Sequence, residues 1–222
     1  METGMLSTDG FMVVPEVVDT RALEQLILEV DRVFEEAGSV NVRNVLKRSS
    51  ILREFAHGLI ESEWLPSGMT PVRGILFNKT QEHNWPVAWH QDLTIAVKER
   101  VGVEGYDPWS VKEGVVHVQP PVEVLANMLT LRLHLDDADG SNGALRVLPG
   151  SHREGVISTE DLKSRSFDDA VDVDCNAGDA LLMSPLLLHS SRRSRKEGNR
   201  RVLHIEYADP ELLDRRLQWY VA

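Results

Sequence analysis

The sequence predicts a mainly β fold with flanking helices, of the α+β or barrel-like kind. Two observations favour it. Over residues 1–66 apolar residues recur at every third or fourth position, as in helices, whereas from about residue 70 onward apolar and polar residues alternate, as in strands. Helices that precede a run of strands differ from the βαβ order of parallel sheets. The 222 residues suit one domain, so we expect a single domain over 1–222 with its core over 70–208.

Two helices are predicted before the strands begin. In the first, apolar residues recur at helical spacing over 23–37, between Asp19 as a capping residue and Gly38 as a stop. The second follows Ser49 and ends before Pro66. Each helix has one apolar stripe, so we expect each to pack that face against a larger body.

The strands are predicted from alternation and from the turn dipeptides between the alternating runs. The clearest runs are 128–136, 144–148, 180–188 and 200–208. The run over 180–188 is more continuously apolar than the others, and Pro185 interrupts it. Asn142-Gly143 and Gly178-Asp179 are typical turn formers.

The segment 93–126 has two interpretations. As a long insertion rich in glycine and proline, it would be an active-site lid or binding loop, because connections of this length are uncommon without a function. Alternatively, 115–119 forms a short strand of its own, which leaves two loops of ordinary length. Loop length alone does not separate these interpretations.

Composition excludes several classes of protein. The 24 Lys and Arg against 35 Asp and Glu give a formal net charge of −11, which opposes binding to nucleic acid or to an anionic membrane surface. The one cysteine, Cys175, allows no intrachain disulfide and is expected to be structural. The sequence has no basic-apolar leader and no apolar stretch of membrane-spanning length. We therefore expect a cytoplasmic protein without nucleic-acid or membrane partners; its oligomeric state is not indicated.

A candidate metal site lies in the sequence Trp89-His90-Gln91-Asp92. On a strand, His90 and Asp92 would project to the same side because they are two residues apart. The best third ligand is His189, which ends an apolar run. Two histidines and one carboxylate form the facial triad of non-haem Fe(II) oxygenases, which leaves one face of the metal open for substrate and dioxygen. Alone, a histidine beside a carboxylate is more often a surface hydrogen-bonded pair.

Further motifs accompany this site over nearly the whole chain. They are LFNK at 76–79, WHQD at 89–92, NGALRVLPGSH at 142–152, AGD at 177–179, and His189 followed by Arg200. In this combination the sequence resembles the phytanoyl-CoA dioxygenase family of Fe(II)- and 2-oxoglutarate-dependent oxygenases. The resemblance implies a double-stranded β-helix core, that is a cupin-like jelly roll, with iron held by His90, Asp92 and His189.

The resemblance also implies a site for the cosubstrate 2-oxoglutarate. In the family, an arginine eleven residues after the distal histidine pairs with the far carboxylate, and that position is Arg200. Ser191, two residues after His189, would donate to the same carboxylate. A planar guanidinium suits this partner because it binds a carboxylate through two hydrogen bonds and stays charged when buried. The rival is Arg201, since alternation does not indicate which face of the strand points inward.

Three further residues concern the cosubstrate or the substrate. In relatives, the strand that holds Asn78 and Lys79 contacts the cosubstrate, although Lys79 is equally well explained as a solvated strand end. Arg132 departs from the family pattern, because relatives often have tryptophan there. Its charge would lie either near 2-oxoglutarate or near an anionic group of the substrate, and the sequence does not separate the two.

Candidates for the substrate pocket follow from pattern alone. His134 and His204 lie on the polar faces of alternating strands, so both are candidates to line a cavity. Trp89 and Trp109 are candidates to frame it, whereas Trp85 is expected to pack around a strand and loop.

The resemblance implies hydroxylation of an unactivated C–H bond in a small molecule, with release of succinate and CO2. Because Asp92 keeps the carboxylate that halogenating relatives lack, hydroxylation is favoured over halogenation, although desaturation and cyclisation use the same triad. Two alternatives come from other classes: a zinc- or other metal-dependent lyase or hydrolase on a jelly-roll scaffold, and a non-catalytic metabolite binder.

Overall fold

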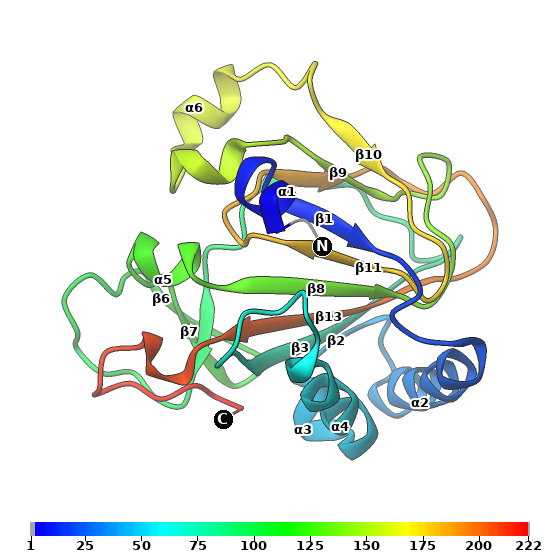
Figure 1. The fold of residues 1–222 in the computed structure, drawn as a ribbon, viewed down its shortest axis with the longest axis horizontal. Coiled ribbons are helices and arrows are strands. Elements are labelled where there is room, and N and C mark those ends of the chain that lie inside the picture. Colours follow the sequence, from blue (N-terminus) through cyan, green and yellow to red (C-terminus); the bar gives the residue numbers. More distant parts are fainter. Residues whose placement is uncertain (1–2, 222) are drawn as a thin grey trace.

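The computed structural model describes residues 3–221, and its core is formed by two facing antiparallel sheets (Figure 1). The larger sheet contains, in spatial order, β1 (Phe11–Val14), β11 (Ala180–Met183), β8 (Leu129–His134), β13 (Arg200–Ala208), β3 (Thr70–Lys79) and β2 (Asn41–Arg43). The smaller contains β10 (Val171–Val173), β9 (Leu145–Val147), β12 (His189–Ser191) and β4 (Val87–His90). The chain crosses repeatedly between these two sheets, for example from β11 to β12 and back to β13, as in a jelly roll, so the predicted mainly β fold is confirmed.

The helices flank these sheets. They are α1 (Thr3–Thr8), α2 (Thr20–Ala37), α3 (Val45–Arg48), α4 (Ser50–Gly58), α5 (Val122–Ala126) and α6 (Thr159–Ser164). The predicted start of α2 is confirmed, because the Asp19 carboxylate accepts the Ala22 N–H at 2.8 Å. Its end is confirmed as well, since Gly38 adopts a left-handed conformation with φ of 58°. The second predicted helix is shorter than expected, because α4 ends at Gly58 and one turn of 3-10 helix follows.

The region 1–66 is less helical than predicted, because β1 and β2 join the larger sheet as its two edge strands. Each is only three or four residues long, and β1 has no residue-by-residue alternation in burial. Pairing with β11 and β3, far away in the sequence, holds them in place. Local periodicity carries no signal for such strands.

The outer face of the larger sheet is apolar and packs against α2, α3 and α4 (Figure 1). Leu76, Leu203 and Leu133 lie side by side across three strands and are fully buried. Burial of each such side chain contributes about 1.5–3 kcal/mol. At Gly74 a Cβ atom would lie 2.7 Å from Leu46, so α3 sits directly on the backbone of β3.

The inner face of the same sheet carries the polar residues of the alternation, arranged in rows across the strands. The rows are Lys79 and Arg200; Phe77, Val202 and His134; Ile75, His204 and Arg132; and Arg73, Glu206 and Thr130. This face points toward the smaller sheet, so charged side chains of the larger sheet line one side of the space between the two sheets.

The segment 93–126 folds as a third sheet instead of an irregular lid. Its strands are β5 (Ile95–Val97), β7 (Val115–Val118) and β6 (Trp109–Lys112). Ile95, Val97 and Val118 are fully buried in an apolar cluster shared with the C-terminal segment. The interpretation with a short strand near 115–119 is therefore correct. In the part of the chain that the structure describes, the helices lack the length and apolar character for a membrane crossing.

Candidate active site

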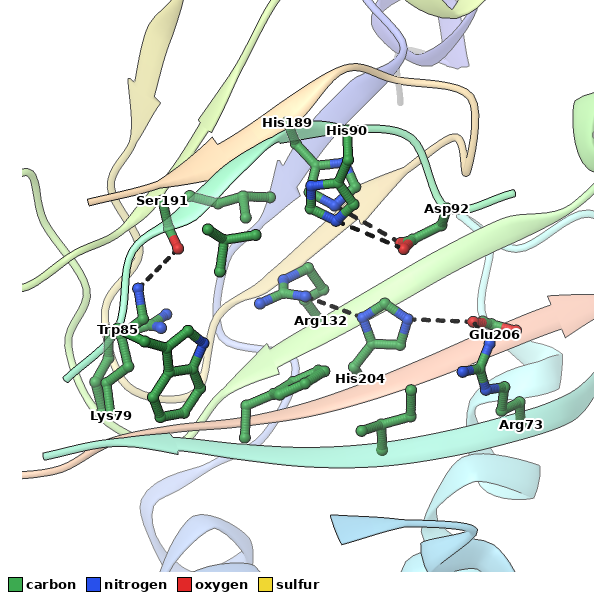
Figure 2. A pocket seen from close by; sticks show the side chains of 15 residues that line it. Arg73, Lys79, Trp85, His90, Asp92, Arg132, His189, Ser191, His204 and Glu206 are labelled. Atoms are coloured by element: carbon green, nitrogen blue, oxygen red, sulfur yellow. Dashed lines mark hydrogen bonds and ion pairs between the residues drawn. The ribbon is translucent and has the colours of Figure 1, made fainter. Parts of the chain in front are cut away.

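His90, Asp92 and His189 meet between the two large sheets (Figure 2). His90 on β4 pairs directly with His189 on β12, and Asp92 follows β4 by two residues. One ligand atom from each residue lies within 4.8 Å of the other two. The histidine Nε2 atoms are 3.9 and 3.7 Å from the Asp92 carboxylate, so all three residues point at one another.

Backbone carbonyls fix the orientation of both imidazoles. His90 Nδ1 lies 2.8 Å from the carbonyl of Ala88, and His189 Nδ1 lies 2.9 Å from that of Leu187. Since a carbonyl only accepts, each Nδ1 carries a proton, and each Nε2 is the nitrogen left to bind a metal. Burial lowers the pKa of His189 to about 4, so its ring is neutral at pH 7 and able to bind a metal.

Gln91, between His90 and Asp92, anchors this segment. Its amide nitrogen donates to the carbonyls of Gly155 at 2.8 Å and Leu186 at 2.6 Å, and its oxygen accepts the Ile157 N–H at 2.9 Å. The side chain therefore joins the backbone of the His90–Asp92 turn to the segment that precedes His189 and to the loop before α6.

Arg200 and Arg201 point in opposite directions. Arg200 lines the cavity and is 4% exposed, and its Nε and Nη1 atoms have no hydrogen-bond partner among the described residues. Burial, reinforced by Arg132, lowers the pKa of Arg200 to about 10, which leaves it charged at neutral pH. Arg201 points outward and forms ion pairs with Asp136 at 2.7 Å and Asp31 at 2.8 Å. The structure thus places Arg200, and not Arg201, in the cavity.

Lys79 and Ser191 lie beside Arg200 at one end of the cavity. Lys79 is 1% exposed, and its Nζ donates to Ser191 Oγ at 2.7 Å and to the Arg192 carbonyl at 2.8 Å. Burial lowers its pKa to about 7, with Arg200 and Arg132 adding to the effect. Asn78 does not line the cavity: it is on the other side of β3, where its side chain binds Asn199 and the Arg200 N–H. Of this pair, Lys79 is the residue that faces inward.

Two loops adjoin this end of the cavity: one contains Trp85 and the other follows Ser191, and both of these residues line the cavity. The Asn84 side chain donates to the Ser194 carbonyl at 2.7 Å and accepts the Ser194 N–H at 2.8 Å. Arg193 also donates to the Asn84 carbonyl at 2.8 Å. Residues 80–86 and 192–199 are therefore joined by hydrogen bonds.

The tryptophans are placed differently from the prediction. Trp89 stacks on Phe167, with ring centroids 4.3 Å apart, and Trp109 packs against the apolar cluster under the third sheet. Neither lines the cavity, whereas Trp85, expected only to pack, does (Figure 2). A β-bulge in the pairing of β4 with β12 explains the difference, because it brings Val87 to the same side as His90 despite their odd spacing.

The polar residues of the inner face form a buried chain. Arg132 Nη1 is 2.9 Å from His204 Nδ1, His204 Nε2 is 3.5 Å from Glu206, and Glu206 pairs with Arg73 at 3.0 Å (Figure 2). All four line the cavity, as predicted for Arg132 and His204. The Arg73–Glu206 pair was not predicted, although Glu206 shares the strand face of Arg200. His134 is fully buried beside the cavity and does not line it; burial lowers its pKa to about 3, so it is neutral.

Comparisons with known proteins agree on one family and one fold. The family model described as phytanoyl-CoA dioxygenase (PhyH) matches residues 6–202. The structure is similar to the non-heme α-ketoglutarate-dependent epimerase SnoN from nogalamycin biosynthesis, with a TM-score of 0.68 and 20% identity over 93% of this chain and 80% of SnoN. HygX from Streptomyces hygroscopicus, crystallised with nickel and 2-oxoglutarate, has a TM-score of 0.67 and 18% identity over 94% of this chain and 87% of its own. AviO1 from Streptomyces viridochromogenes Tue57 has a TM-score of 0.64 and 22% identity over 95% and 94%. At these identities the structural similarity establishes the fold.

Proposed function

Because this chain belongs to the phytanoyl-CoA dioxygenase family, we propose that it is an Fe(II)- and 2-oxoglutarate-dependent dioxygenase that hydroxylates an unactivated C–H bond of a small molecule. One observation carries the proposal. The cavity that holds His90, Asp92 and His189 also holds Arg200, a buried guanidinium that lacks a carboxylate partner among residues 3–221.

The three clustered residues fit iron. Two neutral imidazole nitrogens and one carboxylate oxygen on one side of a metal are the donor set of non-haem Fe(II) enzymes. Both histidines donate their other ring nitrogen to a backbone carbonyl, as metal-binding histidines usually do. His90, Asp92 and His189 would hold the ion. Iron and 2-oxoglutarate together would supply the chemistry: dioxygen oxidises 2-oxoglutarate to succinate and CO2, and its second oxygen atom becomes the hydroxyl group of the product.

The far end of the cavity fits the second carboxylate of 2-oxoglutarate. The Arg200 guanidinium has two unpartnered nitrogens, and Lys79 and Ser191 present further donors beside it. Charge-assisted hydrogen bonds to a carboxylate would satisfy these buried groups. The protein's own part in the reaction is therefore to neutralise the dianion and to fix its orientation toward the metal.

The structural neighbours support this assignment and define its alternatives. SnoN is described as an α-ketoglutarate-dependent epimerase, and HygX was crystallised with 2-oxoglutarate. A fold shared with an epimerase makes the product the decisive measurement: hydroxylation adds the mass of one oxygen atom, desaturation removes two hydrogens, and epimerisation leaves the mass unchanged. A zinc hydrolase or lyase would have no use for an Arg200 carboxylate site.

The first experiment is anaerobic titration of the protein with Fe(II) and 2-oxoglutarate. A chelated complex should give a visible charge-transfer band. The band should disappear in Asp92→Ala and His189→Ala and persist in His83→Ala, whose histidine is exposed on a loop. Iron-loaded, folded protein without the band would contradict the proposal, as would an unchanged band in the two ligand variants. Succinate release with a panel of small molecules then identifies the substrate.

A further inference from the structure

Arg132 is a second buried guanidinium without a carboxylate partner. It extends from β8 into the middle of the cavity and is 7% exposed (Figure 2). Its Nη1 atom lies 2.9 Å from His204 Nδ1, and its Nε atom has no partner among the described residues. Within residues 3–221 no ion pair joins Arg132 to an acidic side chain. A buried, uncompensated charge is strongly unfavourable, so such a residue indicates that an anion from outside binds there.

The charge balance of the cavity leads to the same conclusion. Six lining residues other than histidine are ionisable: the cations Arg73, Lys79, Arg132 and Arg200 and the carboxylates Asp92 and Glu206. Because Fe(II) and the 2-oxoglutarate dianion cancel each other, binding both leaves the excess of cations unchanged. Arg73 and Glu206 compensate each other at 3.0 Å, and Asp92 belongs to the metal. The excess is two cations, Lys79 and Arg132. Lys79 lies beside Arg200 and donates to Ser191 and the Arg192 carbonyl, whereas Arg132 stands apart from that end of the cavity.

The position of Arg132 separates it from the cosubstrate end. Arg200 and Lys79 share one row of the inner face, whereas Arg132 lies two rows further along, opposite His204. Successive rows are about 7 Å apart, because residues that share a strand face are two positions apart. His204 contacts only the Nη1 atom of the guanidinium, and Arg132 as a whole lines the cavity.

We propose that the primary substrate is an anion and that Arg132 binds its charged group, which is a carboxylate, phosphate or sulfate. This inference rests on the proposed function and adds the chemical class of the substrate. The whole chain has a net charge of −11, so it would repel an anionic substrate in general. The positive charge that attracts such a substrate is therefore specific to this cavity. A planar guanidinium is suited to each of these groups because it forms two parallel charge-assisted hydrogen bonds.

The test is calorimetric titration of the anaerobic Fe(II)–2-oxoglutarate complex with acetate, inorganic phosphate and sulfate at constant ionic strength. Acetamide, which has the shape of acetate without its charge, is the neutral control. We expect at least one anion to bind and to shift the charge-transfer band, and acetamide to do neither. Arg132→Gln should lower the affinity for the anion by at least about tenfold and change the affinity for 2-oxoglutarate by less than about threefold. Arg132→Lys should retain part of the affinity, and Arg146→Gln, outside the cavity, all of it.

Two results would overturn the proposal. One is loss of 2-oxoglutarate affinity in Arg132→Gln as large as in Arg200→Gln, which would make Arg132 a cosubstrate residue. The other is equal binding of acetate and acetamide, or no binding of any anion. The same anion titrations on metal-free protein separate this proposal from the proposed function. If the Fe(II)–2-oxoglutarate complex gives no charge-transfer band, the iron chemistry is contradicted. If the anion still binds, and its binding depends on Arg132 but not on Arg200, the anion site is supported.

Discussion

His90 and His189 lie directly opposite each other in neighbouring antiparallel strands, with ring centroids 4.1 Å apart and both Nε2 atoms toward Asp92. A divalent metal should therefore stabilise the fold. With metal at about a hundred times its Kd, we expect about 2.7 kcal/mol and a rise in Tm of roughly 5–10 °C. Differential scanning calorimetry with Fe(II) under anaerobic conditions, before and after EDTA, measures this. His189→Ala should abolish the rise and His83→Ala should keep it; a rise in both variants would place the metal elsewhere.

Substitutions at two adjacent arginines should have opposite effects. Arg200→Gln removes a buried charge that has no carboxylate partner, so it should abolish 2-oxoglutarate binding without lowering the stability of the ligand-free protein. Arg201→Gln breaks ion pairs to Asp136 and Asp31 and should cost about 1–3 kcal/mol of unfolding free energy while 2-oxoglutarate binding persists. Urea denaturation and calorimetry on both variants measure the two quantities. The reverse pattern would exchange their roles.

Lys79 should make stability and cosubstrate binding depend on pH. Burial lowers its pKa from 10.5 to about 7 in the folded protein. Between these values the unfolded chain binds more protons, so the unfolding free energy of the metal-free protein should rise with pH across that interval. The affinity for the 2-oxoglutarate dianion should fall over the same interval, because binding favours the protonated amine. Urea denaturation and calorimetry across the interval should show both trends in the wild type, and Lys79→Met should lose both. If the wild type and Lys79→Met had the same pH profiles, Lys79 would not be the group that causes these trends.

Gln91→Leu should loosen the metal site. The substitution leaves the Gly155 and Leu186 carbonyls and the Ile157 N–H without their partner, which should lower the free energy of unfolding by about 1–3 kcal/mol. The turn between His90 and Asp92 loses its anchor, so metal affinity should fall by about 10–100-fold, as it does when residues that support metal ligands are replaced. Calorimetric metal titration of this variant measures the change in affinity, and Gln81→Leu, at an exposed position, is the control. Unchanged affinity would show that Gln91 supports only the fold.

The Arg73–Glu206 pair should behave as a unit. Both side chains are nearly buried and their charged atoms are 3.0 Å apart. Glu206→Gln leaves Arg73 unpaired and should cost about 3–5 kcal/mol, whereas the double variant Arg73→Met, Glu206→Leu should lose far less. A double-mutant cycle by urea denaturation gives the coupling energy. Additive losses would show that the pair is not coupled.

Sequence periodicity predicts the faces of long strands well. In β13 the alternation separates Arg200 from Arg201. His90 and Asp92 also face one cavity as predicted, although β4 ends at His90 and Asp92 lies just beyond the strand. The same alternation points Trp89 away from the cavity, since it is adjacent to His90, although it was a substrate candidate. What periodicity cannot supply is the bulge that turns Trp85 inward, because that depends on pairing with β12, a hundred residues away.

Long-range pairing also explains the other omissions. β1 and β2 exist because the larger sheet offers them edges, and no local pattern marks them. The Arg73–Glu206 pair requires the register of β3 against β13, which a single sequence does not reveal. The partnership of His189 with His90 and Asp92 was predicted through the family resemblance; the residues alone offered His189 only as the best candidate.

The hydrogen bonds between Asn84 and Ser194 hold together two loops that adjoin Trp85 and Ser191 in the cavity wall. They join two loops more than a hundred residues apart in the chain, and together they are worth only about 1–3 kcal/mol. Neither loop belongs to the large sheets, so separating them leaves every strand pair beneath intact. The two loops can therefore part at the cost of a few hydrogen bonds, while the scaffold that holds His90, Asp92 and His189 stays as it is.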